Sequence, residues 1–133
     1  MNKTSAIQWL KIAYHDLQSA IILYEANHYT DSIGNDLQQA IEKILKSLFA
    51  FKNQKIPKTH NLYELYDAVD DIKLEDYELD YLDMATEYLK DDRYPNPNYF
   101  LPPKEEIKEV LDFTNDLMGK VCKILNIDKK ELK

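Results

Sequence analysis

The stretch that decides the fold runs from Asn35 to Ala50 and reads NDLQQAIEKILKSLFA. Its apolar residues recur every three or four positions, a spacing that continues to Phe51: Leu37, Ile41, Ile44, Leu48. This spacing puts the apolar side chains on one face of an α-helix and predicts that the face is buried. The same stretch holds a polar set that is unusually dense for a central helix: Gln38, Gln39, Glu42, Lys43, Lys46.

Helical spacing of apolar residues continues on both sides of this stretch. Short polar links join the segments, and such links make neighbouring helices antiparallel. We therefore predict an all-α fold, an antiparallel up-and-down helical bundle of three long and two shorter helices. The predicted helices cover about 5–27, 31–52, 61–70, 75–91 and 103–125.

Residues suited to helix ends mark several of these boundaries. Ser5 is the predicted N-cap of the first helix, because a hydroxyl can accept a hydrogen bond from a free N–H of the first turn. Asn61 is predicted to cap the third helix, with Glu64 completing a capping box. Pro103 suits the start of the last helix. Residues 128–133 then form a charged tail that is expected to fray.

The composition fits one helical domain spanning residues 1–133. The chain has only two glycines, which disfavours turn-rich β architectures. Its formal net charge of −7 argues against non-specific binding to nucleic acid but leaves room for a small local basic site. Cys122 is the single cysteine, so no internal disulfide can form. We find neither a signal peptide nor an apolar run of the roughly 18 residues needed to span a membrane. The expected location is the cytoplasm, away from membranes.

Few residues show the pattern of a metal or nucleophile site. The three histidines include no pair at the four-residue spacing of metal ligands on a helix, and His60 is expected to bond a loop carbonyl. Cys122 lies beside apolar residues and is expected to be a buried, inert thiol. An acidic row on the fourth helix is expected to be a solvated face rather than a magnesium site: Asp76, Asp80, Asp83, Glu87. No Gly-rich phosphate loop is present, so we predict no cofactor and no metal.

Three basic residues have the chemistry to contact a phosphate. Lys46 follows Glu42 by four residues, so it either forms a helical ion pair worth about 0.2–0.5 kcal/mol or, like Lys43, offers its charge to a phosphate. Arg93 stands where the fourth helix meets a Pro-rich, aromatic segment. Its guanidinium either satisfies the last helical carbonyls or binds a phosphate bidentately. The aromatic side chains beside it either pin the segment to the bundle or stack on a base.

Several short motifs also stand out in combination: Gln38-Gln39-Ala40, Glu42-Lys43, Leu45-Lys46, Thr59-His60 with Leu62, and Arg93-Tyr94-Pro95. The combination resembles the HEPN domain family over about residues 6–125. The resemblance implies a helical bundle that pairs into a homodimer with a cleft at the interface. Many members of the family are metal-independent ribonucleases, often toxins, encoded beside a minimal nucleotidyltransferase that silences them.

The catalytic signature of those ribonucleases is an Arg and a His separated by four to six residues. The Arg steadies phosphate, and the His works in the cleavage. Counted from Arg93, the corresponding positions are 98–100, and none of them holds His. The resemblance therefore carries over Arg93 as a phosphate or nucleotide contact, with Lys43 and Lys46 as further candidates.

We accordingly expect a HEPN protein that binds a nucleotide or RNA in a dimer cleft and acts with a nucleotidyltransferase partner in a toxin–antitoxin-like system. One alternative is a ribonuclease toxin with a diverged centre built on Arg93 with Tyr99 or Asn98, although a phenol with a reference pKa of about 10 is a poor base. Another alternative is a non-catalytic module that binds only protein. The sequence leaves these three functions open.

Overall fold

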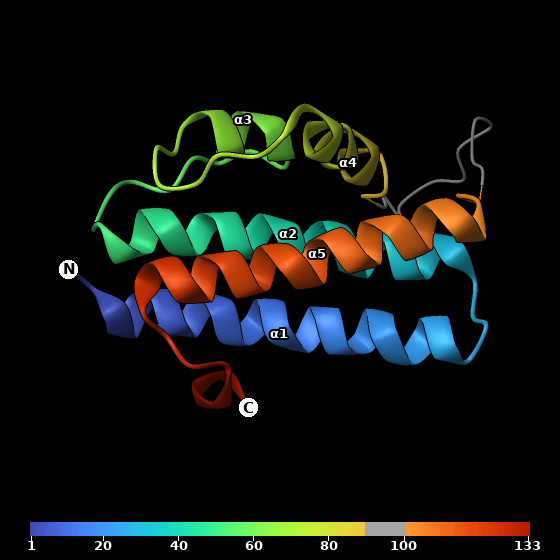
Figure 1. Cartoon of the computed structure of the whole chain (residues 1–133), viewed down its shortest axis with the longest axis horizontal. Helices are drawn as coiled ribbons and strands as arrows, with labels where there is room; N and C mark the ends of the chain where they lie inside the picture. The colour runs from blue at the N-terminus through green and yellow to red at the C-terminus, as the bar shows by residue number, and fades with distance from the viewer. Residues whose placement is uncertain (90–100) are drawn as a thin grey trace.

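The computed structural model describes residues 1–89 and 101–133, and its helices form an antiparallel bundle (Figure 1). The elements are α1 (Lys3–Glu25), α2 (Thr30–Phe51), α3 (Leu62–Asp67), α4 (Asp76–Thr86), α5 (Lys104–Leu125) and the 3-10 helix η1 (Lys129–Leu132). Helices α1, α2 and α5 have 22 or 23 residues, α3 and α4 are shorter, and the described residues contain no strand. The predicted all-α bundle is confirmed. None of the described helices is both long enough and apolar enough to cross a membrane.

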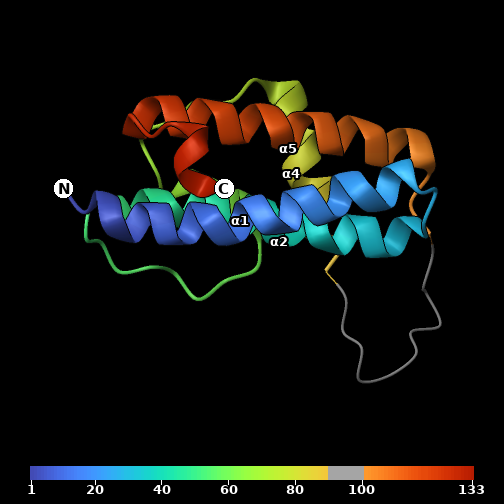
Figure 2. The same ribbon diagram turned by 90° about the horizontal axis from the view of Figure 1, so that it is seen from below.

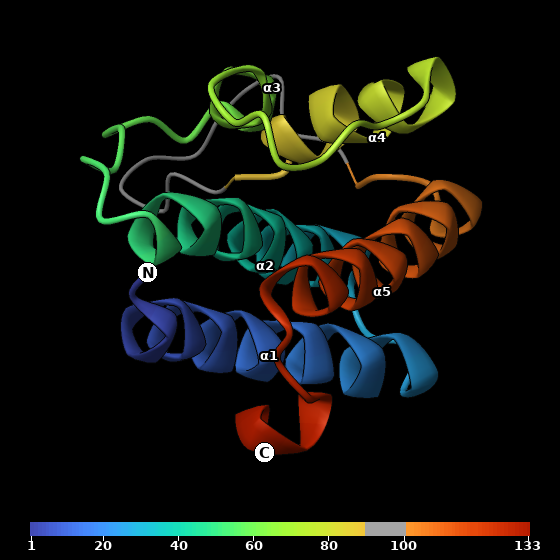
Figure 3. The same ribbon diagram turned by 60° about the vertical axis from the view of Figure 1, so that its left-hand side comes forward.

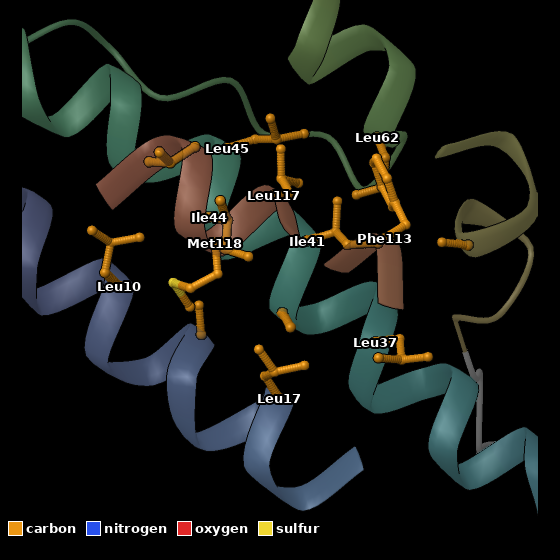
Figure 4. Close-up of a cluster of buried hydrophobic side chains, with 14 of the residues drawn as sticks. Leu10, Leu17, Leu37, Ile41, Ile44, Leu45, Leu62, Phe113, Leu117 and Met118 are labelled. Atoms are coloured by element: carbon orange, nitrogen blue, oxygen red, sulfur yellow. The ribbon is translucent and has the colours of Figure 1, made fainter. Parts of the chain in front are cut away.

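Helix α2 is the element around which the others pack. It contacts α1, α3, α4 and α5, and Figure 3 shows it between α1 and the layer formed by α3 and α4. Thirteen of its 22 residues are buried, against five of the 23 in α1, because it meets neighbours on several faces. Full burial of each large apolar side chain adds about 1.5–3 kcal/mol. Figure 4 shows side chains of α1, α2 and α5 that meet in this core, among them Leu10, Leu17, Leu37, Ile41, Ile44, Leu117 and Met118.

Helix α1 begins and ends two residues earlier than the sequence indicated. The prediction of Ser5 as N-cap is wrong, because the cap is Asn2, whose side-chain oxygen accepts a hydrogen bond from the Ser5 N–H at 3.0 Å. At the other end, Glu25 is the last helical residue. Asn27 has a φ of 56°, in the left-handed region that asparagine tolerates, so the chain turns there into α2.

The start of α3 agrees in part with the predicted capping box. Asn61 caps the helix, and its side-chain oxygen accepts from the Glu64 N–H at 3.0 Å. The reciprocal bond of a capping box, from the Asn61 N–H to the Glu64 carboxylate, is not made, because the Thr59 hydroxyl accepts that N–H instead. The Thr59 hydroxyl donates to the Glu64 carboxylate at 2.9 Å and accepts from the Asn61 N–H at 3.1 Å.

Helix α4 ends at Thr86, earlier than the predicted boundary near residue 91. The Thr86 hydroxyl donates to the Leu82 carbonyl at 2.8 Å and accepts from the Leu62 N–H at 3.1 Å. This side chain therefore joins the end of α4 to the start of α3. Residues 90 and 91 of the predicted helix lie outside the described residues.

The C-terminal tail differs from the frayed segment that its charges suggested. Asn126 adopts a left-handed conformation that ends α5, and Lys129–Leu132 then form η1. Side chains of Asp128 and Glu131 cap η1 reciprocally. Leu132 is only 1% exposed, and η1 packs against α1 (Figure 2). One buried leucine, placed among charged residues in the sequence, is what anchors the tail.

Gly34 provides the close approach between α2 and the residues that follow α4. A Cβ added at Gly34 would lie 2.9 Å from Cγ of Tyr88. The Tyr88 ring is buried, and its hydroxyl donates to the carboxylate of Glu106 in α5. Burial and the neighbouring carboxylate raise the pKa of Tyr88 above its ordinary value, so it remains a donor at neutral pH. Because the ring is buried and its hydroxyl is bonded to Glu106, it has little room to move away from a larger residue at position 34.

We therefore expect Gly34→Ala to destabilise the protein. Overpacking costs about 1–3 kcal/mol, which outweighs the roughly 0.5–1 kcal/mol that alanine gains over glycine in a helix. Gly119→Ala in α5 is the matched control, because its Cβ would meet only the flexible Lys129 side chain at 3.8 Å, and it should stabilise. Urea unfolding of both variants measures the effect. Equal gains in stability for the two would show that Tyr88 does not constrain position 34.

Candidate functional site

A buried carboxylate on α2 is the centre of the most densely connected polar cluster of the described chain. Glu42 is 5% exposed and accepts three side-chain hydrogen bonds. Its Oε1 accepts from Gln38 Nε2 at 3.0 Å and lies 2.8 Å from Nδ1 of His60, and its Oε2 accepts from Lys46 Nζ at 2.9 Å. Gln38, Glu42 and Lys46 are spaced by four residues, so the helix places them on one face. We call these four residues the Glu42 cluster.

The Glu42 carboxylate is ionised at neutral pH. Burial acts to raise its pKa, but the hydrogen bonds from His60, Lys46 and Gln38 together outweigh burial and hold the pKa below its ordinary value of 4.5. An ionised carboxylate can only accept hydrogen bonds, so Nδ1 of His60 must be the donor. The proton on Nδ1 leaves Nε2 as the second, unprotonated nitrogen when the ring is neutral.

The imidazole of His60 is nevertheless exposed to solvent. Its side chain keeps 66% of its accessible area, whereas that of Glu42 keeps 6%. Sequence reasoning expected His60 to bond a loop carbonyl, and this is wrong, since the partner of its ring is a carboxylate 18 residues away. The carbonyl in the cluster is that of His60 itself, which accepts from Gln38 Nε2 at 3.2 Å.

Gln38 fixes the backbone beneath the histidine. The residue is fully buried, and its own side-chain oxygen accepts from Gln39 Nε2 at 2.6 Å. The amide nitrogen of Gln38 thus donates to both Glu42 and the His60 carbonyl, while its oxygen is satisfied by Gln39. Because Asn61 caps α3 directly afterwards, the backbone on both sides of the imidazole is anchored.

The two lysines predicted as phosphate contacts both have acidic partners. Lys46 forms the predicted helical ion pair with Glu42, and its ammonium lies 5.9 Å from the centre of the Trp9 ring. Lys43 pairs with Asp16 of α1 at 2.7 Å. The side chain of Lys46 is 12% exposed and that of Lys43 is 19% exposed. The structural interpretation of the Glu42–Lys46 pair is confirmed, and the phosphate role of either lysine stays a prediction.

Arg93 and the candidates Asn98 and Tyr99 lie outside the described residues. Thr86 is bonded to the first residue of α3, two positions after His60. The end of α4 therefore lies beside the start of α3.

Other candidate surfaces suit an anionic ligand less well. An open hollow of about 200 Å³ between α4 and α5 has several acidic side chains in its lining and would repel phosphate: Tyr77, Glu78, Tyr81, Glu109, Asp112, Phe113, Asp116. Cys122 is buried, and burial raises the pKa of its thiol, as expected for an inert cysteine. Within residues 1–89 and 101–133, no three His, Cys, Asp or Glu side chains are grouped to hold a metal ion.

Comparison with known proteins gives one family and two similar structures. The family model described as HEPN domain matches residues 6–125. The crystal structure of TT1696 from Thermus thermophilus has a TM-score of 0.76 at 24% identity, covering 93% of this chain and 99% of that one. The structure of ST0689, an archaeal HEPN homologue, has a TM-score of 0.65 at 19% identity, covering 96% and 98%. No curated protein matches.

The Glu42 cluster should make the stability of the protein depend on pH. A folded-state pKa below 4.5 means that the ionised carboxylate contributes stability fully above that value, and the contribution is lost as pH falls through the lower folded-state pKa. Glu42→Gln should therefore cost about 1–3 kcal/mol at pH 7 and progressively less in acid. Urea unfolding between about pH 3 and pH 7 tests this. A cost that stays constant across the range would mean that the charge of Glu42 adds nothing.

Proposed function

The chain belongs to the HEPN domain family, and on that premise we propose that it binds a nucleotide or RNA through its phosphate groups. The proposal includes a homodimer as the binding form. It also includes a nucleotidyltransferase protein as partner, in a toxin–antitoxin-like system. The observation that carries the proposal is the match of the family model over residues 6–125, which contains the Arg93-Tyr94-Pro95 motif.

The chemistry of Arg93 supports a phosphate contact. A guanidinium presents a planar fork of donors that fits phosphate bidentately, which the ammonium of a lysine cannot do. Lys43 and Lys46 remain secondary candidates, because each would have to share its charge with the carboxylate it already pairs with. The chain carries a net charge of −7, so a phosphate ligand needs such a local site.

The homodimer is supported by apolar side chains left on the surface of α1. Ile12 is 48% exposed and Ile22 is 63% exposed. Exposed apolar area of this kind suits contact with a second copy.

The ribonuclease alternative is favoured by one specific observation. The described residues present an imidazole, His60, that is exposed and supported by a buried carboxylate. The alternative based on the sequence placed the chemistry on Tyr99 or Asn98, which are poorer proton-transfer groups at neutral pH. A histidine that lies outside the family's usual spacing can supply this chemistry.

The binding proposal predicts that ligands stabilise the protein through Arg93. A ligand at 100 times its Kd adds about 2.7 kcal/mol to the free energy of unfolding. Arg93→Ala should weaken binding by about 1.5–3 kcal/mol, and Arg93→Lys, which keeps the charge but loses the fork, should fall between it and the wild type.

Urea unfolding of the three proteins, with and without a panel of nucleotides and a short RNA, measures this. If no member of the panel stabilises the wild type, the binding proposal is wrong and the non-catalytic protein-interaction module is left. Equal stabilisation of the wild type and Arg93→Ala would remove Arg93 from the site.

A further inference from the structure

The hollow between α4 and α5 gathers more negative charge than the described residues neutralise. Four carboxylates line it, three of them spaced by three or four residues along α5: Glu78, Glu109, Asp112, Asp116. Like charges at this spacing destabilise a helix. Glu78 accepts from Lys120 at 3.1 Å, and Asp112 pairs with Lys108 at 2.7 Å, but both lysine side chains stay about half exposed. The other two carboxylates form no ion pair with a described residue.

Aromatic rings make up the rest of the lining. The ring of Tyr81 lies between the other two, with centroid distances of 5.4 Å to Phe113 and 6.4 Å to Tyr77. The face of an aromatic ring attracts a cation. Within the described part of the chain, no carboxylates are grouped closely enough with other ligands to hold a metal ion. Rings beside separate carboxylates therefore suit an organic cation.

The hydroxyl of Tyr81 responds to the same negative charge. Partial burial and the neighbouring Glu109 carboxylate raise the pKa of Tyr81 above its ordinary value of 10.0. The carboxylate charge that opposes ionisation of this phenol attracts a cation to the same place. The electrostatics of the hollow and its aromatic lining thus favour the same class of ligand.

We propose that this hollow is the docking site for an arginine side chain of a partner protein. A guanidinium is planar, so it can stack on a ring while its N–H groups donate to carboxylates as a fork, and an ammonium offers no such plane. The volume of about 200 Å³ lies below the roughly 300–1,000 Å³ of pockets for drug-sized ligands and suits one side chain. Because the hollow is open, the side chain can enter while its backbone stays outside.

The surface beside the hollow favours a basic protein segment over a free cation. Asp76 and Asp80 of α4 are exposed and directly precede Tyr77 and Tyr81 in the sequence. They extend the negative surface beyond the hollow, where further basic residues of the same segment can pair. Complementary charge of this kind steers a partner and sets its orientation. The inference is independent of the proposed phosphate binding, because the two ligands carry opposite charges and the Glu42 cluster lies on α2.

The test measures, by calorimetry, the affinity of the full chain for a short peptide of alternating arginine and serine at about 0.15 M salt. A lysine–serine peptide of the same length should bind more weakly. The double variant Glu109→Gln/Asp116→Asn should weaken binding of the arginine peptide by about tenfold or more, because it removes charged acceptors. Its melting temperature should not fall, since like charges are removed from one helix.

Two further variants separate a built site from general attraction to an acidic protein. Glu25→Gln/Asp67→Asn removes the same charge from exposed positions on α1 and α3, and should change the affinity by less than about twofold. Tyr81→Leu should narrow the difference between the arginine and lysine peptides, because it removes the ring on which a guanidinium stacks.

Each adverse result overturns the proposal for a stated reason. Absence of arginine-peptide binding to the wild type removes the site. Equal weakening in the two double variants would mean that binding follows net charge alone, and equal affinity for the two peptides would mean that the guanidinium is not recognised. Spermidine that binds the wild type more tightly than the arginine peptide, and loses this affinity in Glu109→Gln/Asp116→Asn, would assign the hollow to a free polyamine instead.

Discussion

The burial of an ionised carboxylate in the middle of α2 is the constraint on which the Glu42 cluster and the loop before α3 depend. Glu42 lies on the helix that all other α-helices contact, and three donors keep its charge stable there. One donor comes from the turn before it, one from the turn after it and one from the loop before α3. Satisfying Glu42 therefore fixes the course of that loop over α2 and with it the position of His60.

The same helix links this cluster to the rest of the bundle. The residues at 34, 38, 42 and 46 are spaced by four, and each meets a different need. Gly34 admits the Tyr88 ring, Gln38 holds the His60 carbonyl, and Lys46 neutralises Glu42. The apolar stripe of α2 packs at the same time against α1 and α5. Helix α2 thus contributes both to the apolar core and to the Glu42 cluster. In that cluster a buried carboxylate is bonded to the exposed imidazole of His60.

The sequence predicted the fold well because helical periodicity is a local signal. The five helices, the Asn61 cap and the Glu42–Lys46 pair all follow from spacings of three or four residues. The errors arise where a partner is distant or a short segment is anchored by one side chain. Leu132 anchors a tail that looks only charged, and Asn2 caps α1 ahead of the expected start.

The candidate site was harder to predict for the same reason. The bond between His60 and Glu42 joins residues 18 apart, and nothing in the spacing of the histidines reveals it. The available signal was the row Gln38, Glu42 and Lys46, whose polarity on a buried helix required partners from another segment. The HEPN signature drew attention to Arg93 and to the missing histidine after it, whereas the structure presents a different histidine.

The central claim is that Glu42 holds His60 through Nδ1 and leaves Nε2 free. Long-range 1H–15N correlation NMR of the imidazole, at a pH where the ring is neutral, reads the tautomer directly. The structure predicts that the proton of His60 resides on Nδ1 in the wild type and that this preference weakens in Glu42→Gln. A neutral ring protonated mainly on Nε2, unchanged by the substitution, would contradict it.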